Sequence, residues 1–230
     1  MRTTRAAIVL AAVGVAFVLS APRPWAAQAE PNQADRARIA QSELQQAEKD
    51  VPKLVPVLEV ERGMTVADVG AGGGAMTVVL AKWLGPTGRV YATDIAARQL
   101  ANIREFVARE RLDNVVVVEG TDRSANLPDA CCDAIFMRDV YHHFTHVEEM
   151  NRSLAAALKP GGRLAIIDFP PERGSTTPEG VPSNRGGHGV TPAIVVDEVP
   201  ASGLKHEKTI EQWPPDGEKG RFFLVLFRKP

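Results

Sequence analysis

Apolar side chains recur at helical spacing in two places in the first half of this chain. Such positions are separated by three or four residues, which puts them on one face of an α-helix. They are Ala40, Leu44, Ala47 and Val51, and then Ala96, Leu100, Ile103 and Val107. Another helix is predicted over 75–84. Pro52 and Pro56 are expected to interrupt the first helix, because a proline inside a helix removes a hydrogen bond.

Short runs rich in β-branched residues alternate with these helices and predict strands. The runs are 65–70, 89–95, 114–119, 133–137 and 163–169. Four consecutive valines in 114–119 predict a strand that is buried on both faces. Thr145 and Glu148 then have the spacing of a capping box at the start of a helix, which 159–162 are expected to end. The apolar face of that helix is Val147, Met150, Leu154 and Leu158.

The alternation of strands and helices with short connections predicts an α/β fold. Repeated strand–helix units build a parallel sheet with helices on both faces. Two further strands, 205–213 and 221–228, are joined by a turn at 214–217 that is too short for a crossover helix, so this pair is expected to be antiparallel. Together these segments predict a doubly wound, mostly parallel, seven-stranded Rossmann-like sheet with an antiparallel C-terminal strand.

Residues 170–190 break this pattern, since they hold four prolines and five glycines. A loop of this length in a compact domain is usually functional or disordered. We interpret it as a lid over a substrate site, and a flexible linker is the alternative. Thr191 and Pro192 then have the N-cap and first-turn chemistry of a helix that ends by Gly203.

The N-terminus has the pattern of an export signal. Arg2 and Arg5 precede a run without charge over 6–19, and Ala27-Gln28-Ala29 follows as a cleavage pattern. The run is shorter than the about 20 residues of a membrane-spanning helix, although an uncleaved anchor stays as the alternative. We therefore expect 1–29 to be a signal peptide or membrane anchor, 30–60 an N-terminal helical segment and 61–230 the main domain of an exported, periplasmic or secreted protein.

Composition narrows the classes of function. With 44% hydrophobic and 24% charged residues, the chain has an ordinary globular composition. Its 27 Lys and Arg against 28 Asp and Glu lack the basic excess of a nucleic-acid-binding protein, so no nucleic-acid partner is expected. The two cysteines, Cys131 and Cys132, are neighbours and cannot form a spaced disulfide framework. We interpret them as packing where a strand begins, with a redox or arsenic-linked role as the alternative.

A glycine-rich turn carries the first candidate chemistry. Residues 70–74 lead into the helix at 75–84, at the sheet edge where open α/β folds bind ligands. Backbone N–H groups of glycine can approach a ligand closely, because no Cβ stands in the way. Asp94 ends the next strand, where its carboxylate can accept both hydroxyls of a ribose. The alternatives are a plain tight turn and an Asp94 that caps the following helix.

Two cofactors fit this turn. Gly70, Gly72 and Ala75 match the dinucleotide pattern G-x-G-x-x-G/A, which leaves an NAD-type site open. The same stretch, from Asp68 through Gly74, resembles the first motif of the class I S-adenosylmethionine-dependent methyltransferases. The resemblance covers 53–230 and continues through Gly120-Thr121-Asp122 to Leu127-Pro128, Cys132-Asp133-Ala134-Ile135, His142-His143-Phe144, and residues 158–164.

This resemblance implies an enzyme that binds S-adenosylmethionine and methylates a small-molecule acceptor. In the family, the first acid and the glycine loop hold the methionine end of the cofactor, the second-strand acid holds the ribose, and the loop after the third strand reaches the adenine. The cofactor-binding residues expected on this basis are Asp68, Gly70, Ala71, Gly72, Gly74, Asp94, Ile95, Asp122 and Arg138. No membrane contact is expected beyond the N-terminal anchor. An NAD(P)-binding oxidoreductase and a non-catalytic small-ligand binding protein are the alternatives.

Histidines gather in two loops of the expected site. A base is needed only where the acceptor must lose a proton, and histidine titrates near neutral pH. The candidate catalytic residues are Asp139, His142, His143 and His188. A histidine that only bonds the loop backbone is the alternative for His142 and His143. The four side chains suit a transition metal, but adjacent histidines on an extended segment point in opposite directions, so no metal site is predicted.

Overall fold

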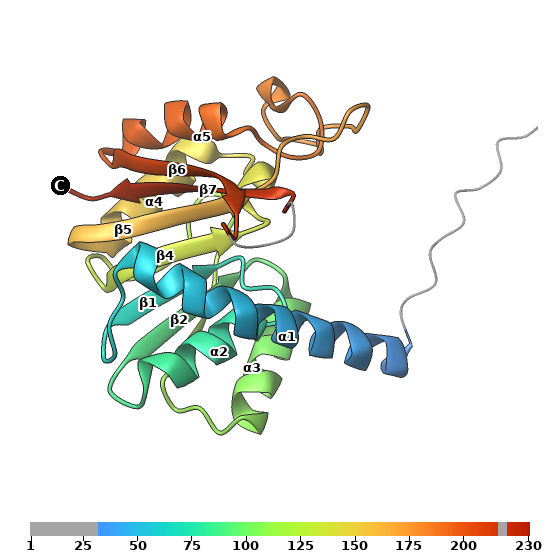
Figure 1. Cartoon of the computed structure of the whole chain (residues 1–230), viewed down its shortest axis with the longest axis vertical. Helices are drawn as coiled ribbons and strands as arrows, with labels where there is room; N and C mark the ends of the chain where they lie inside the picture. The colour runs from blue at the N-terminus through green and yellow to red at the C-terminus, as the bar shows by residue number, and fades with distance from the viewer. Residues whose placement is uncertain (1–31, 216–219) are drawn as a thin grey trace, which may run out of the picture.

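The computed structural model describes residues 32–215 and 220–230 (Figure 1). The signal or anchor expected at 1–29 lies outside the described residues, as do the last two residues of the turn expected at 214–217. In the described part of the chain, no helix is both long enough and apolar enough to cross a membrane.

Within the described residues, seven strands form one mixed sheet, which confirms the predicted fold class. The strands are β1 Thr65–Val69, β2 Arg89–Asp94, β3 Val115–Glu119, β4 Cys132–Arg138, β5 Leu158–Asp168, β6 Lys205–Trp213 and β7 Phe222–Arg228. Their order across the sheet is β3-β2-β1-β4-β5-β7-β6. The pairs from β3 to β5 are parallel, and β7 is antiparallel to both β5 and β6. The carboxyl ends of the parallel strands therefore meet along one edge.

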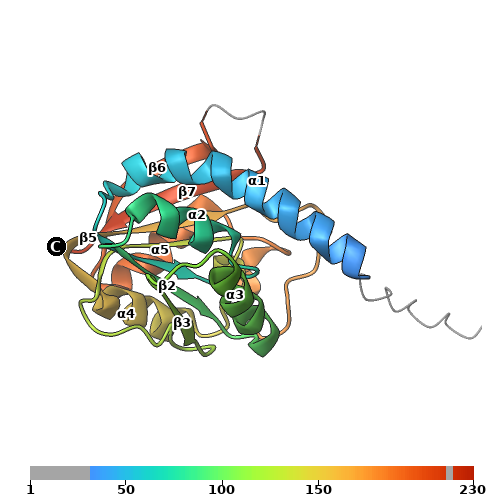
Figure 2. The same ribbon diagram turned by 90° about the horizontal axis from the view of Figure 1, so that it is seen from below.

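Helices cover both faces of the sheet (Figures 1 and 2). Helices α1 Gln33–Leu58 and α2 Ala75–Leu84 pack on one face, and α4 Val147–Ala157 and α5 Pro192–Glu198 pack on the other. Helix α3 Ala97–Arg109 packs against β2 and β3. Short 3-10 turns are found at η1 Tyr141–His143, η2 Ser183–Arg185 and η3 Val199–Ser202. The core thus consists of two apolar layers, one on each side of the sheet.

Pro52 and Pro56 do not interrupt α1, so that prediction was wrong. Each proline inside a helix costs about 3 kcal/mol. Burial of an apolar side chain contributes about 1.5 to 3 kcal/mol. The last turns of α1 bury four such side chains against α2 and the sheet, namely Val51, Leu54, Val55 and Leu58. Together these contribute about 6 to 12 kcal/mol against a cost of about 6, and the helix continues through both prolines.

Two other predicted details differ from the structure. Strand β3 is not buried on both faces, since it is an edge strand and Val116 is 39% exposed. Thr145 does not cap α4, because the helix begins one residue later, with His146 at the N-cap position. The Thr145 hydroxyl instead lies 3.0 Å from His146 Nδ1.

Strand β5 begins earlier than predicted. Helix α4 ends at Ala157, so Leu158, predicted on its apolar face, is instead the first residue of β5. Residues 159–162 continue the strand rather than form a separate turn. The C-terminal tail causes this extension, because the Gly161 N–H donates to the Lys229 carbonyl at 2.9 Å and the Lys229 N–H donates to the Gly162 carbonyl at 2.9 Å. The N-cap predicted at Thr191 is confirmed, since its side chain accepts from the Ile194 N–H.

The loop over 170–190 is anchored to the domain near its C-terminal end. Arg185 is fully buried and pairs with Glu198 Oε1 at 2.9 Å. The Val190 N–H donates to the Phe169 carbonyl at 2.9 Å. The described part of this loop is therefore tied down by a buried ion pair and by backbone pairing, and its role as a lid stays a prediction.

Cys131 and Cys132 lie where β4 begins, as predicted. The structure joins their sulfurs in a disulfide between sequence neighbours. Cys132 is fully buried in the apolar layer under α4, and Cys131 packs against the same layer. Because it joins neighbours, the bond ties no distant parts of the fold together.

Candidate functional site

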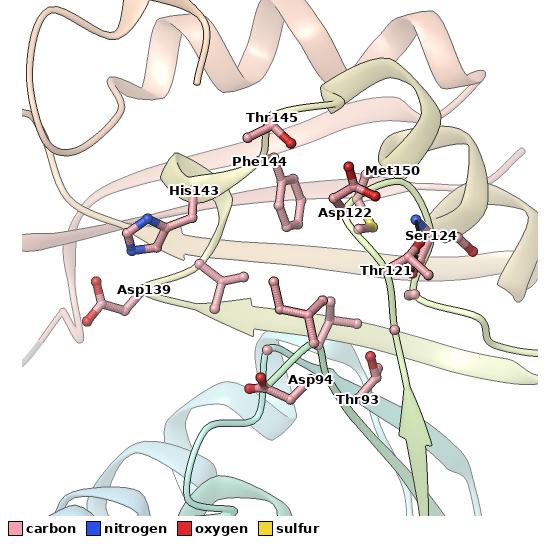
Figure 3. A pocket seen from close by; sticks show the side chains of 16 residues that line it. Thr93, Asp94, Thr121, Asp122, Ser124, Asp139, His143, Phe144, Thr145 and Met150 are labelled. Carbon is pink, nitrogen blue, oxygen red and sulfur yellow. Dashed lines mark hydrogen bonds between the residues drawn. The ribbon is translucent and has the colours of Figure 1, made fainter. Parts of the chain in front are cut away.

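Two adjoining cavities open at the carboxyl ends of the parallel strands. The strand-end cavity, about 380 Å³, is lined by residues that follow β1, β2, β3 and β4 (Figure 3). The α1 cavity, about 460 Å³, lies between the glycine-rich turn, the end of β4 and helix α1. Gly70, Asp139 and Val140 line both cavities. An elongated ligand therefore has room on both sides of these three residues.

Gly70 forms part of the boundary between the two cavities. Its φ is +70°, in the left-handed region that favours glycine, and a Cβ at this position would lie 2.5 Å from Val140 Cγ2. The N–H groups of Gly70 and Ala71 both donate to the Thr93 carbonyl, at 2.8 and 2.9 Å, which fixes the turn to β2. No residue with a Cβ fits here without displacing Val140.

The other residues of the turn divide into two groups. Ala71 and Gly72 line the α1 cavity, as expected of ligand-binding residues. Gly74 does not line either cavity, but takes a φ of +84° as the N-cap of α2, where a Cβ would lie 3.2 Å from Ile103 Cγ1. Gly74 therefore serves the close packing of α2 against α3 rather than the cavities.

Asp94 is held in place by the backbone around it. Its Oδ2 accepts from the Gly72 N–H at 3.0 Å, and its Oδ1 accepts from the Ala96 N–H at 2.9 Å. A carboxylate has about four lone pairs, so these bonds leave about two for a ligand. Asp94 lines the strand-end cavity together with Ile95, whose side chain is 65% exposed. Asp94 therefore faces the cavity and bonds the backbone before α3, but the N-cap of that helix is Ala96, which has no side-chain cap bond. The cap interpretation was wrong, and the ribose interpretation stays a prediction.

Asp68 is buried beneath the α1 cavity. Only 3% of the residue is exposed, and the Thr77 hydroxyl donates to its Oδ2 at 2.6 Å. Burial raises the pKa of this carboxyl from its ordinary 3.8 to about 7, and the Thr77 hydrogen bond opposes the rise while the charge of Asp94 adds to it. A positive charge in the α1 cavity would favour the ionised form of Asp68.

Arg138 lines the α1 cavity at the end of β4. Its guanidinium lies 3.6 Å from Asp50 Oδ2 and stacks 4.7 Å from the Phe222 ring centre. Its Nε is buried and has no hydrogen-bond partner among the described residues. The side chain as a whole is 29% exposed, so its guanidinium brings a positive charge to the α1 cavity.

Helix α1 contributes to this cavity in a way that the sequence does not reveal. Ser42, Glu43 and Gln46 line it alongside the glycine-rich turn. On an amphipathic helix these residues belong to the polar face, which normally contacts solvent. Their position becomes apparent only once α1 lies across the carboxyl edge of the sheet (Figure 2).

The far side of the strand-end cavity contains Asp122, as the resemblance implied (Figure 3). Asp122 is exposed and its Oδ2 lies 3.0 Å from His146 Nδ1. Phe144 and Met150 give the same cavity an apolar wall that the sequence analysis did not predict. The cavity therefore combines polar residues on its rim with apolar side chains inside.

The four candidate catalytic residues come together at the ends of β4 and β5. Asp139 and His143 line the strand-end cavity and lie next to each other in Figure 3. His142 is fully buried behind them, and its Nε2 lies 3.2 Å from His188 Nε2. Neither His142 nor His188 lines either of the two cavities.

Asp168 is a residue of this group that the sequence analysis missed. It is fully buried, its Oδ1 lies 2.9 Å from His142 Nδ1, and its Oδ2 accepts from the His142 backbone N–H at 3.1 Å. The available signal was its position as the last residue of β5, at the edge where α/β folds bind ligands.

The two adjacent histidines do not point in opposite directions. They lie on the 3-10 turn η1 rather than on an extended segment, and their ring centres are 4.0 Å apart. The geometric reason for predicting no metal site was therefore wrong. Burial lowers the pKa of His143, and the neighbouring His142 and His188 lower it further, so its neutral form is favoured.

Comparisons with known proteins agree with this geometry. Residues 67–166 match a family model described as a methyltransferase domain. The ubiquinone/menaquinone biosynthesis C-methyltransferase UbiE of Enterobacter sp. (strain 638) is 34% identical over 116 residues, and that of Escherichia fergusonii is 33% identical over 111. Each match covers 48% of this chain and 44% of the relative, so the chain spans less than half the length of these relatives.

Solved structures match over more of the chain. A SAM dependent methyltransferase from Aquifex aeolicus has a TM-score of 0.63 and 28% identity, and the match covers 79% of this chain and 90% of that one. A TehB-like SAM-dependent methyltransferase from Corynebacterium glutamicum has a TM-score of 0.58 over 86% of this chain and 100% of that one. At 18% identity, the second comparison shows the fold alone.

Proposed function

This chain carries a methyltransferase domain of the class I S-adenosylmethionine-dependent family, and from that premise we propose that the protein transfers a methyl group from S-adenosylmethionine to a small-molecule acceptor. One observation carries the proposal. Two carboxylates, Asp68 and Asp94, lie on either side of Gly70 in the joined cavities. Their spacing suits the ribose hydroxyls and the methionine ammonium group of a single elongated cofactor.

The residues present fit this cofactor. The free lone pairs of Asp94 would hold the ribose hydroxyls, and the apolar wall beyond it would hold the adenine. Asp68 would hold the methionine ammonium group, and the guanidinium of Arg138, which lines the same cavity, would hold the methionine carboxylate. These pairings place each charge of the methionine end opposite an existing charge of the protein.

The chain contributes mainly alignment to the reaction. When bound, the cofactor supplies a methyl group on a positively charged sulfur, which becomes neutral as the methyl group leaves. Holding two reactants in line can contribute roughly 7 to 11 kcal/mol of the barrier. Gly70 and Val140 pack tightly at the boundary and fix the position of the cavities relative to each other. We assign proton removal from the acceptor to Asp139, because it is exposed and lines both cavities.

The relatives suggest which acceptors to test first. The two curated relatives are named for C-methylation in ubiquinone and menaquinone biosynthesis. A phenolic or quinol ring methylated at carbon must lose a proton, and a base contributes about 10² to 10⁴ in rate. Phenols and quinols are therefore our first candidate acceptors. The comparisons give no support to an oxidoreductase or to a non-catalytic binding protein.

Calorimetric titration of the full chain with S-adenosylmethionine, and separately with NAD, tests the cofactor. Asp94→Asn keeps the shape of the side chain and removes its charge. Hydrogen bonds to a charged group are worth about 1.5 to 3 kcal/mol, so affinity for S-adenosylmethionine should fall roughly 10- to 150-fold. Asp129→Asn, an exposed carboxylate away from both cavities, is the matched control. Binding of NAD alone, or equal affinity in both variants, would overturn the proposal.

Turnover needs a separate assay. The full chain would be incubated with radiolabelled S-adenosylmethionine and a panel of phenols and quinols, and the labelled products would be separated. Methylated product is expected from at least one of them. If the cofactor binds at micromolar concentration and no acceptor in a broader small-molecule panel is labelled, the non-catalytic binding interpretation replaces ours.

We also propose that the protein is exported. The support is the sequence pattern at 1–29, where two arginines precede an uncharged run and an A-x-A cleavage pattern. Fractionation of cells that express the full chain tests this, together with mass determination of the N-terminus. A shortened chain outside the cytoplasm is expected, and an intact chain in the cytoplasmic fraction would refute export.

A further inference from the structure

A cluster of histidines lies beside the strand-end cavity and has no part in the cofactor interactions described above. His142, His143 and His188 each offer a ring nitrogen, and the three nitrogens lie within 4.8 Å of one another. His142 and His143 come from η1, whereas His188 comes from the loop over 170–190. The fold therefore brings three imidazoles together from two separate segments.

The orientation of His142 is set by Asp168. Its Nδ1 lies 2.9 Å from Asp168 Oδ1, and both side chains are fully buried. A carboxylate only accepts hydrogen bonds, so the proton resides on Nδ1 and the lone pair on Nε2. Histidines that bind metals almost always donate their other ring N–H in this way, to a carboxylate or a carbonyl. His142 thus has the tautomer and the fixed ring that a metal ligand needs.

The distance from His142 to His188 suits a shared ion. Their Nε2 atoms are 3.2 Å apart. With Zn–N bonds of about 2.0 to 2.1 Å and tetrahedral angles, two nitrogen ligands lie about 3.4 Å apart. The backbone N–H of His188 donates to Ser175 Oγ at 2.8 Å, which fixes this part of the loop against its own first half. The two nitrogens therefore lie at about the separation that a shared ion requires.

We propose that His142, His143 and His188 bind a divalent transition-metal ion, with Zn²⁺ as the expected ion. Imidazole suits zinc, copper, iron and nickel. Three protein ligands leave the fourth position of a tetrahedral site open for water or for a donor atom of a substrate. His143 lines the strand-end cavity, so the open position lies next to the place where the acceptor is expected. The ion would also tie the loop over 170–190 to the end of β4.

This inference goes beyond methyl transfer and does not depend on it. A bound ion would occupy the lone pair of His143 and would leave the assignment of proton removal to Asp139 unchanged. The cluster of Asp139, His142 and Asp168 also has ligand atoms within 4.8 Å of one another. Asp168, however, already holds His142 through Nδ1, so we assign it a positioning role rather than a place on the ion.

Metal binding can be measured without any methyl acceptor. Protein made from the full chain would be stripped with a chelator and titrated with Zn²⁺ by calorimetry, and then with Co²⁺ followed by visible absorption. One ion per chain and the intense visible bands of four-coordinate Co²⁺ are expected. His206→Ala, an exposed histidine on β6, is the matched control and should bind as the wild type does.

Two variants separate a ligand from a residue that positions one. Asp168→Asn should weaken Zn²⁺ binding by about 10- to 100-fold, as is typical when a partner that orients a ligand is removed. Loss of a ligand should cost more, so His188→Ala should bind at least about 100-fold more weakly. Circular dichroism checks that each variant is folded. If His188→Ala does not fold, His143→Ala replaces it, because His143 is exposed.

Two results would overturn the proposal. The first is a wild-type protein that takes up no stoichiometric Zn²⁺ or Co²⁺, which would leave His142 and His188 as a simple hydrogen-bonded pair. The second is a folded His188→Ala or His143→Ala variant that binds Zn²⁺ as tightly as the His206→Ala control. Either result leaves the proposal on S-adenosylmethionine untouched, since that rests on binding of a different ligand.

Discussion

Replacing Asp68 by asparagine should stabilise the protein at high pH and leave its stability at low pH nearly unchanged. Asp68 is 3% exposed and its pKa is raised to about 7, mainly by burial. Asparagine has the same shape, can accept the Thr77 hydroxyl through its carbonyl, and cannot ionise. The variant therefore removes the cost of a buried charge and little else.

The size of the effect follows from the two pKa values. In the unfolded chain the carboxyl titrates near 3.8, whereas in the fold it titrates near 7. Between these pH values the folded protein keeps a proton that the unfolded chain has released, so the free energy of unfolding falls as the pH rises. Each pKa unit is worth about 1.4 kcal/mol, which gives a loss of about 4 kcal/mol above pH 7. Below about pH 4 both states are protonated and the loss disappears.

Urea denaturation of the wild type and of Asp68→Asn at several pH values measures this difference. The free energies of unfolding should be similar near about pH 4 and should diverge up to about 4 kcal/mol near about pH 8, with the variant more stable. Asp129→Asn, an exposed carboxylate, should stay within about 0.5 kcal/mol of the wild type throughout. A constant offset between Asp68→Asn and the wild type at every pH would refute the reasoning.

The same group links pH to the proposed cofactor. The methionine ammonium group would favour ionised Asp68, so S-adenosylmethionine binding should release a proton below about pH 7 and weaken as the pH falls. Titrations in two buffers of different ionisation enthalpy measure the protons released. Asp68→Asn should bind more weakly and release no proton from this site.

Three further predictions follow from the described contacts. Gly70→Ala should lower the free energy of unfolding by about 1 to 3 kcal/mol in thermal denaturation, because the left-handed backbone and the 2.5 Å contact both oppose a Cβ. Gly72→Ala should lower it by less, since a Cβ there would have no atom within 4 Å. Arg185→Ala should cost about 3 to 5 kcal/mol in urea denaturation, since it leaves Glu198 without its buried partner. Asp139→Asn should lower kcat by about 10² to 10⁴ while the affinity for S-adenosylmethionine stays the same.

Each of these has a result that would contradict it. An equal loss in the two glycine variants would mean that Val140 moves aside freely. A change within about 1 kcal/mol for Arg185→Ala, the range of exposed ion pairs such as that of Arg221 and Glu172, would show that Arg185 is hydrated. An unchanged kcat in Asp139→Asn would assign proton removal to another group or show that none is needed.

Much of the fold was predictable because its strands and helices have local patterns. The order of the elements, the antiparallel end of the sheet and the family resemblance are confirmed. Two of the errors arose where tertiary structure outweighed a local signal. The prolines of α1 are tolerated because that helix buries an apolar face, and the valines of β3 are partly exposed because no strand follows at that edge.

In the candidate site, too, the features that are local in sequence could be predicted. The turn from Asp68 to Gly72 and the acid at Asp94 could be identified from the sequence, because a strand, a glycine-rich turn and a strand-end carboxylate are each local features whose positions in an α/β sheet follow from its topology. The sequence by itself thus determined at which edge of the sheet the two cavities lie and that Asp68 and Asp94 line them.

Only the tertiary structure decided what surrounds these residues. Asp168 meets His142 across 26 positions in the sequence, and His188 meets it across 46. The path of the loop over 170–190 decides that second contact, and the 3-10 turn η1 decides that the two adjacent histidines face each other. These arrangements depend on the packing of segments that are distant in the chain, for which a local pattern of hydrophobic and polar residues carries no information.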